Sequence, residues 1–223
     1  MYKFKADHVG LVAETDGAVI TRGATPLNQD AAGDYTFAYD ELIARVRELS
    51  IQKLEKPTLI DICLLDCVDE RDIFVPEIEA FGVHGYRWPS TYWPPYLQAG
   101  WMPTTLHGVE VCDHIGCLCW WPIQGMAEGD DYPVFLESPG WDLDGCVENI
   151  TTIVKRKYPE SVIYFHCSSG ADRTGALHTC YLLKQGMGFQ KACEAADSLV
   201  GPPNVDYCRL RTAYDVYLKS KNK

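Results

Sequence analysis

The sequence predicts an α/β fold in which a mostly parallel central sheet is flanked by helices. Short apolar runs alternate along the chain with segments whose apolar residues recur at helical spacing, which is typical of such a sheet. The clearest run, 58–65, is apolar almost throughout, as expected of a strand buried on both faces. With 223 residues and 47% hydrophobic content, the chain can bury one sizeable core. We therefore expect one domain over 1–223, with an irregular insertion around 88–141.

The first half of the chain carries the elements on which this fold depends. A short strand is expected at 19–23, and a helix at 39–49 because its apolar positions follow the helical period. Lys56-Pro57 interrupts the chain before the strand at 58–65. A short helix at 77–80 and a strand at 83–86 are expected next.

The stretch 88–141 is the least regular part of the sequence. It holds all six tryptophans and several prolines, and we expect one strand within it, near 116–121. The regular pattern then returns, with an expected strand at 162–165 and expected helices at 144–158, 176–183, 190–199 and 207–218.

Residues 166–175, His-Cys-Ser-Ser-Gly-Ala-Asp-Arg-Thr-Gly, join the strand at 162–165 to the helix at 176–183. A tight loop between a strand and a helix start holds anions, because its N–H groups turn inward and the helix N-terminus adds partial positive charge. A cysteine in such a loop is expected to react as a thiolate. Arg173 offers a planar fork that can clamp two phosphate oxygens. A thiolate inside a phosphate cradle predicts a phosphatase that forms a cysteinyl-phosphate intermediate.

The same ten residues resemble the signature of the cysteine-dependent protein tyrosine and dual-specificity phosphatases, which is His-Cys, five residues, Arg, then Ser or Thr. Residues 20–26 and 59–62 are more weakly similar to the early strands of dual-specificity phosphatases. The resemblance implies a dual-specificity-phosphatase-like fold. It also implies that His166 supports the loop through hydrogen bonds and does not act as a base.

Each remaining residue of the signature has an expected role. Cys167 is the nucleophile, and Arg173 binds the phosphoryl oxygens and stabilises the charge of the transition state. Thr174 is expected to donate its hydroxyl to the thiolate, and Gly170 to let the backbone turn without a Cβ clash. The backbone amides expected to bind phosphate are those of Ser168, Ser169, Gly170, Ala171, Asp172 and Arg173.

Two places in the sequence compete for the general acid that protonates the leaving group. The run 121–125, Trp-Pro-Ile-Gln-Gly, resembles the acid loop of tyrosine phosphatases without its aspartate, and that alignment places the acid near Asp130 or Asp131. Glu137 and Asp142 are also within range. Asp172 lies in the signature loop, as in myotubularin lipid phosphatases and a group of bacterial broad-specificity phosphatases. In those families the loop aspartate is thought to be the acid, so Asp172 is favoured. The bacterial group has a lysine where this chain has Ala171.

Four functions are compatible with a cysteine in an anion loop, and the fourth, a persulfide or arsenate enzyme, fits the Arg173-Thr174-Gly175 ending poorly. The first is hydrolysis of phosphoprotein, phosphotyrosine above all. The second is hydrolysis of a phosphoinositide or inositol phosphate, which Asp172 favours and the missing loop lysine disfavours. The third is a pseudophosphatase that binds phosphate without turnover, which the intact Cys167 and Arg173 disfavour.

The net charge and the cysteine content of the chain indicate which partners it can bind and in which cellular compartment it works. The net charge is −11 and the pI is near 4.9, which argues against binding nucleic acid or an anionic membrane surface. No apolar run is long enough to span a membrane, and the first residues lack an apolar signal stretch. Ten cysteines in a chain of this kind favour a reducing cytoplasm.

No cofactor and no metal are expected. One group of residues has zinc-ligand types but not the spacing of a zinc finger or ribbon. This group consists of His107, Cys112, His114, Cys117 and Cys119. Whether Cys63 or Cys67 forms a reversible disulfide with Cys167 is left open.

Overall fold

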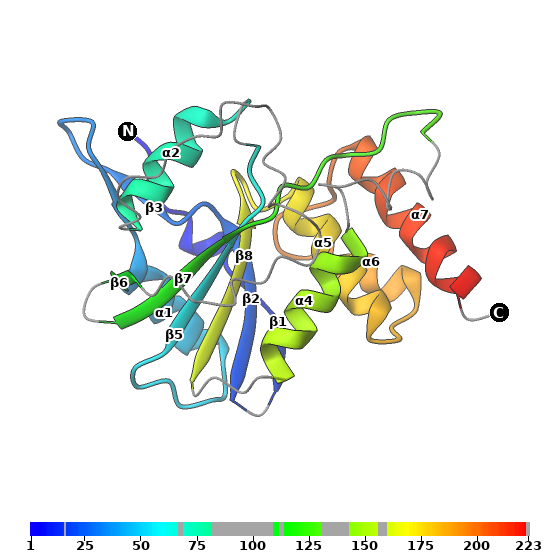
Figure 1. Cartoon of the computed structure of the whole chain (residues 1–223), viewed down its shortest axis with the longest axis horizontal. Helices are drawn as coiled ribbons and strands as arrows, with labels where there is room; N and C mark the ends of the chain where they lie inside the picture. The colour runs from blue at the N-terminus through cyan, green and yellow to red at the C-terminus, as the bar shows by residue number, and fades with distance from the viewer. Residues whose placement is uncertain are drawn as a thin grey trace.

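The computed structural model describes residues 1–15, 17–66, 69–81, 109–111, 114–130, 143–155 and 160–221. Its centre is a six-stranded sheet in the order β1-β2-β8-β5-β7-β6 (Figure 1). These strands are β1 (Gly10–Thr15), β2 (Ala18–Ala24), β8 (Ser161–Cys167), β5 (Thr58–Cys63), β7 (His114–Trp120) and β6 (Val109–Val111). The four inner strands run parallel, and the two edge strands pair antiparallel to their neighbours. The predicted mostly parallel sheet is therefore confirmed.

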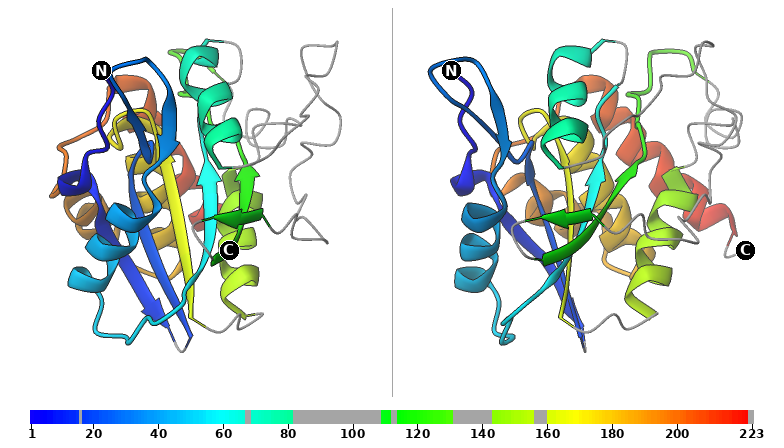
Figure 2. Two further views of the ribbon diagram at one scale, coloured as in Figure 1. Left: turned by 90° about the vertical axis from the view of Figure 1, so that its left-hand side faces the viewer. Right: turned by 60° about the vertical axis from the view of Figure 1, so that its left-hand side comes forward.

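Helices cover both faces of this sheet (Figures 1 and 2). On one face lie α4 (Leu143–Lys155), α5 (Asp172–Lys184), α6 (Phe189–Asp197) and α7 (Val205–Lys221). The other face carries α1 (Tyr39–Leu49) and the short 3₁₀ helix η1 (Ala6–His8). Helix α2 (Arg71–Ala80) and the small hairpin of β3 (Leu27–Gln29) and β4 (Tyr35–Phe37) complete the elements described.

The alternation of side chains along β8 divides the core into two apolar clusters. Ile163 and Phe165 pack toward α4, α5 and α7, whereas Val162 and Tyr164 pack toward α1. Every residue of β8 is buried, which explains why its sequence is nearly continuously apolar.

Most predicted elements are present, with shifted ends. The helix at 39–49 has the predicted bounds, and the strand at 58–65 ends at Cys63. The helix expected at 77–80 is longer, because α2 begins at Arg71 and continues through Pro76. The strand expected at 83–86 lies outside the described residues, as do parts of the insertion at 88–141.

The parallel order brings the carboxyl ends of β2, β8 and β5 to one edge of the sheet. The signature loop begins there, directly after β8, and α5 follows it. Among the described helices, none combines the length and apolar character needed to cross a bilayer.

Candidate functional site

The signature loop crosses from the end of β8 to the start of α5. Cys167 is the last residue of the strand and only 3% exposed, and Asp172 is the first residue of the helix. The loop residues between them thus lie at the N-terminus of a 13-residue helix, where N–H groups have no partner within the helix. The predicted strand, tight loop and helix start are confirmed as secondary structure.

Four consecutive carbonyl oxygens of the loop, those of residues 167–170, are each bound by a side chain from the first 25 residues of the chain. In order, the donors are Thr25 Oγ1 at 3.3 Å, the Tyr2 hydroxyl at 3.3 Å, His8 Nδ1 at 2.7 Å and the Arg22 guanidinium. The C=O and N–H of one trans peptide point in opposite directions. Carbonyls held toward the N-terminal segment therefore turn the N–H groups of residues 168–171 to the other side.

The N–H groups of residues 168–171 have almost no hydrogen-bond partners among the described residues. Among the described residues, the amides of Ser168, Ser169 and Gly170 have no acceptor, and that of Ala171 meets Ser169 Oγ only at 3.4 Å. With the first amides of α5, which have no partner within the helix, they form a run of N–H donors without strong acceptors among the described residues.

Gly170 is required where the loop crosses β2. Its φ is +82°, and a Cβ built on it would lie 2.8 Å from the carbonyl carbon and oxygen of Gly23. An L side chain is disfavoured by both the dihedral and the contact. A side chain at position 170 would therefore collide with the backbone of β2.

Arg22, a buried residue of β2, holds the loop in place at Gly170. It is 1% exposed and donates to the carbonyls of Gly170 and, at 2.6 Å, of Ala196 in α6. Its Nη1 also lies 3.3 Å from Nδ1 of His178. Burial lowers the pKa of Arg22 to about 10, and burial together with the Arg22 charge lowers the pKa of His178 to about 3. His178 is therefore neutral and accepts from Arg22.

Arg173 is held in position by two side chains from distant parts of the sequence. Its Nη1 forms an ion pair with Glu70, which directly precedes α2, and its Nε donates to the hydroxyl of Tyr207 at 3.2 Å. Burial alone would lower the pKa of Arg173, but Tyr207 and Glu70 outweigh it and raise that pKa. No acceptor within the described residues meets its Nη2, so one arm of the fork has no partner there.

Asp172 and Thr174 both have partners within the protein. One oxygen of Asp172, Oδ1, accepts the N–H of Asn204 at 2.7 Å. The Thr174 hydroxyl is fully buried and lies 3.5 Å from the carbonyl oxygen of Gly23, to which it donates. The roles of Asp172 as acid and of Thr174 toward the thiolate stay predictions.

The structure describes only one of the acidic residues after 121–125 that were considered as the general acid, Asp130. Asp131, Glu137 and Asp142 lie outside the described residues. Asp130 is exposed, and its Oδ2 accepts the N–H of Ala127 at 2.7 Å, as a turn-stabilising aspartate does. The segment before it is tied to α7, because the carbonyl of Ile123 accepts the Tyr207 hydroxyl at 3.3 Å.

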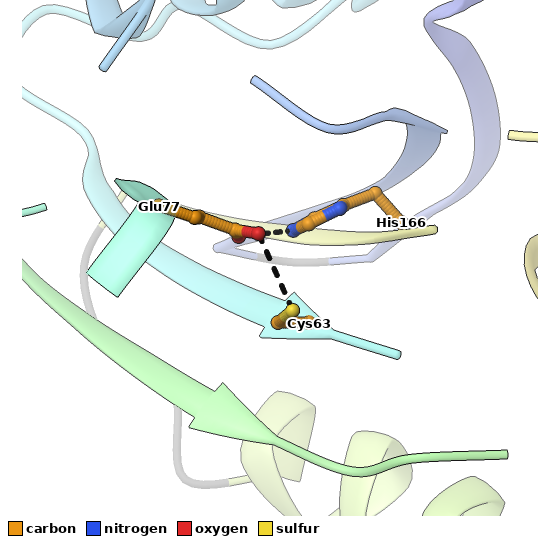
Figure 3. Close-up of side chains that lie close together, drawn as sticks. All are labelled: Cys63, Glu77 and His166. Atoms are coloured by element: carbon orange, nitrogen blue, oxygen red, sulfur yellow. Dashed lines mark hydrogen bonds and ion pairs between the residues drawn. The ribbon is translucent and has the colours of Figure 1, made fainter. Parts of the chain in front are cut away.

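His166 lies behind the loop in a fully buried cluster of polar side chains (Figure 3). Its Nε2 is 2.8 Å from Glu77 Oε1 and 3.2 Å from Asp61 Oδ1. Burial alone would lower the pKa of His166, but Glu77 and Asp61 together raise it well above its usual value. The Cys63 thiol donates to Glu77 Oε2 at 3.3 Å. These contacts join His166 to β5 and α2, and its expected support of the loop stays a prediction.

Several residues of the site carry no local signal in the sequence. Tyr2, His8, Glu70 and Tyr207 reach the loop only because the fold brings distant segments together. Glu77 is different, because a carboxylate on the buried side of a helix next to apolar residues is unusual and stands out in the sequence. Of the zinc-ligand types weighed above, His107 and Cys112 lie outside the described residues.

Together, the fold and the loop define an α/β protein in which a turn rich in N–H groups without acceptors among the described residues joins a parallel strand to a helix. No protein-family model and no curated protein sequence matches this chain. Solved structures similar to it include human DUSP28, at 13% identity and a TM-score of 0.44, covering 89% of this chain and 99% of that chain. Kinase associated phosphatase aligns at 12% identity and a TM-score of 0.49, covering 91% of this chain and 86% of its own. A leucine rich repeat and phosphatase domain containing protein from Entamoeba histolytica aligns at 9% identity and a TM-score of 0.44, covering 96% and 95%. At these identities and scores the likeness does not bear on the chemistry, which depends on the residues of the loop.

Proposed function

We propose that the protein is a phosphomonoester hydrolase that works through a cysteinyl-phosphate intermediate, most simply a protein tyrosine or dual-specificity phosphatase. The observation that supports this most strongly is the orientation of the loop. Four outward carbonyls turn a ring of N–H donors toward the side on which a phosphate would be held beside Cys167. The fixed Arg173 adds the cation that such a cradle needs.

The proposed reaction has two displacements at phosphorus. In the first, the Cys167 thiolate attacks in line, an S–P bond forms, and the P–O bond to the leaving group breaks. Asp172 gives its proton to the leaving oxygen. In the second, water attacks the cysteinyl-phosphate and gives a proton to the same carboxylate, and the S–P bond breaks to release phosphate. The loop amides and Arg173 stabilise the equatorial oxygens in both transition states.

Hydrolysis of a small aryl phosphate tests this proposal. The unmodified protein should turn the substrate over, and Cys167→Ser should abolish turnover, because a serine hydroxyl in the same cradle remains protonated. Cys193→Ser, on α6, is the matched control and should retain activity. Vanadate should inhibit the unmodified protein. A protein that binds phosphate or vanadate and never turns over the ester would instead be a pseudophosphatase, the third function considered.

A phosphoinositide or inositol phosphate is the second candidate substrate. The observation that favours it is the aspartate at the start of α5, inside the cradle. A panel of phosphotyrosine, phosphoserine and phosphothreonine peptides beside soluble phosphoinositides separates the candidates by kcat/KM. We expect the phosphotyrosine peptides to be the best substrates, because the chain has a net charge of −11 and no lysine in the loop to meet a polyanionic head group.

The compartment follows from the same chemistry. A thiolate nucleophile works only while it stays reduced, so we place the protein in a reducing environment, the cytoplasm. Cysteines without a disulfide in the described part of the chain support this, including the buried Cys63, Cys119 and Cys180. The expected extent of the catalytic domain, 1–223, is part of the same proposal.

A further inference from the structure

The polar cluster behind the loop brings three metal-ligand types together from three elements. Cys63 ends β5, Glu77 projects from α2, and His166 precedes the nucleophile on β8 (Figure 3). One potential ligand atom from each, Sγ, a carboxylate oxygen and a ring nitrogen, lies within 4.8 Å of the other two. All three side chains are buried.

The cluster contains polar atoms for which the described residues supply no well-aligned hydrogen bond. These are both oxygens of Asp61, Oε1 of Glu77 and both ring nitrogens of His166. The short contacts of His166 with Glu77 and Asp61 have ion-pair distances without hydrogen-bond geometry. Buried groups left in this state cost free energy unless another partner satisfies them.

Acidic groups outnumber basic groups in the cluster. Two carboxyl groups face one imidazole, so the fully ionised cluster has a net negative charge in the core.

From this convergence of a thiol, a carboxylate and an imidazole in a closed site, we propose that Cys63, Glu77 and His166 bind one zinc ion. Sulfur, nitrogen and oxygen ligands in one set suit zinc, whereas magnesium and calcium require oxygen ligands throughout. Binding releases the thiol proton of Cys63 and the proton of His166. Asp61 Oδ1 lies 3.2 Å from His166 Nε2, beside this set of three ligands.

The distances permit this with small movements. Metal–ligand bonds of about 2.0 to 2.3 Å place neighbouring ligand atoms of a tetrahedral site roughly 3.3 to 3.7 Å apart. Cys63 Sγ and Glu77 Oε2 are already 3.3 Å apart, and His166 Nε2 and Glu77 Oε1 are 2.8 Å apart. The ion would join the ends of β5 and β8 to α2 directly behind the cradle. Its role is structural, and the inference does not depend on the proposed phosphatase activity.

The test uses the full chain with Cys167→Ser, so that zinc cannot bind the proposed nucleophile and activity plays no part. The protein is stripped with a chelator and titrated with Zn²⁺, and bound metal is measured after gel filtration. We expect one zinc ion per chain in Cys167→Ser and in the control that adds Cys193→Ser. We expect at least a tenfold weaker affinity when Cys63→Ser or Glu77→Gln is added. Stoichiometric zinc that survives Cys63→Ser would overturn the proposal, because the ion would then lie on other cysteines.

Two readouts on the folded Cys167→Ser protein keep the proposal testable if a cluster variant fails to fold. Co²⁺ in place of zinc should give a thiolate-to-cobalt charge-transfer band, and one equivalent of Zn²⁺ should raise the Tm by several degrees, because the ion binds only the folded state. No charge-transfer band and an unchanged Tm would overturn the proposal. The metal-free cluster would then be held by protons shared among His166, Asp61 and Glu77.

Discussion

Arg22 donates a hydrogen bond to the carbonyl of Gly170, and this bond joins β2 to the signature loop where the loop lies closest to Gly23. The same guanidinium reaches the carbonyl of Ala196 at 2.6 Å, so one buried side chain links the loop, β2 and α6. The strand pairing brings the two segments together, since β2 and β8 are parallel neighbours whose ends meet at Ala24 and Cys167. Arg22 therefore acts on the site through the loop and is a positioning residue.

Arg22→Lys should lower both activity and stability. A lysine ammonium cannot span the two carbonyls, so at least one buried acceptor loses its partner, which costs about 1 to 3 kcal/mol. We expect kcat on an aryl phosphate to fall at least tenfold, because the loop amides lose their orientation. Urea unfolding and steady-state kinetics measure the two effects. Arg45→Lys, at a half-buried position of α1, is the control and should change neither, because a lysine can keep the ion pair with Glu48. Unchanged kinetics in Arg22→Lys would show that the loop holds its shape without this bond.

His178 should make stability depend on pH between its unfolded and folded pKa values. Arg22 and Arg211 face it, and burial together with these cations lowers its pKa to about 3 in the folded protein. Between the ordinary value of about 6.5 and about 3, the unfolded chain binds a proton that the folded chain does not. The free energy of unfolding therefore falls as pH falls through that window, by up to about 1.4 kcal/mol per pH unit from this group.

His178→Gln isolates this contribution, because glutamine can still accept from Arg22 but does not titrate. Urea unfolding at several pH values from 7 to 4 should give a shallower slope for the variant than for the unmodified protein. Equal slopes would mean that His178 is protonated in the folded state.

Asp172→Asn should reveal the general acid through its dependence on the leaving group. Asparagine can still accept the N–H of Asn204, so the start of α5 should keep its structure. With an alkyl phosphate, whose leaving group is poor, we expect kcat to fall about 100-fold, the low end of the usual contribution of a general acid. With a nitrophenyl ester the loss should be much smaller. Asp131→Asn and Asp130→Asn are the matched comparisons, and a large loss in either one with a normal Asp172→Asn would place the acid in that segment.

Tyr207→Phe should loosen Arg173 without removing its charge. The variant keeps the ring in the core and removes only the hydroxyl that accepts from Arg173 Nε and donates to Ile123. One lost hydrogen bond corresponds to about 1 kcal/mol, or a fall of about fivefold in kcat/KM. Tyr217→Phe, which removes a hydroxyl bonded to Asp144, is the control and should leave kcat/KM unchanged. An unchanged kcat/KM in Tyr207→Phe would leave Glu70 as the group that orients the guanidinium.

The fold was predictable where the sequence alternates buried strands with amphipathic helices. The strand at 162–165, the helix at 39–49 and the helix after the loop follow from local periodicity, so their positions needed no tertiary information. The start of α2 was not predictable, because Pro76 resembles a helix breaker and only packing in the fold reveals the helix that contains it. Likewise, the short strands β3 and β4 are defined mainly by pairing with each other.

The candidate site likewise contains residues that the sequence marks and residues that only the fold brings together. Cys167, Gly170 and Arg173 lie within ten residues, and their spacing alone indicated an anion loop. Glu70 and Tyr207 reach Arg173 across long sequence separations, and no local pattern marks them. The cluster of Cys63, Glu77 and His166 is a property of the packed sheet, since β5, β8 and α2 must come together before its ligand atoms converge.

The most direct test of the account is a search for the covalent intermediate. The protein is mixed with a phosphorylated aryl substrate, quenched in acid within one turnover, digested and examined by mass spectrometry. We predict one phosphoryl group on the sulfur of Cys167, at a level that rises when Asp172→Asn slows its hydrolysis, and none on any other cysteine. Steady turnover with no phosphoryl group on Cys167, or turnover that persists in Cys167→Ser, would contradict the account.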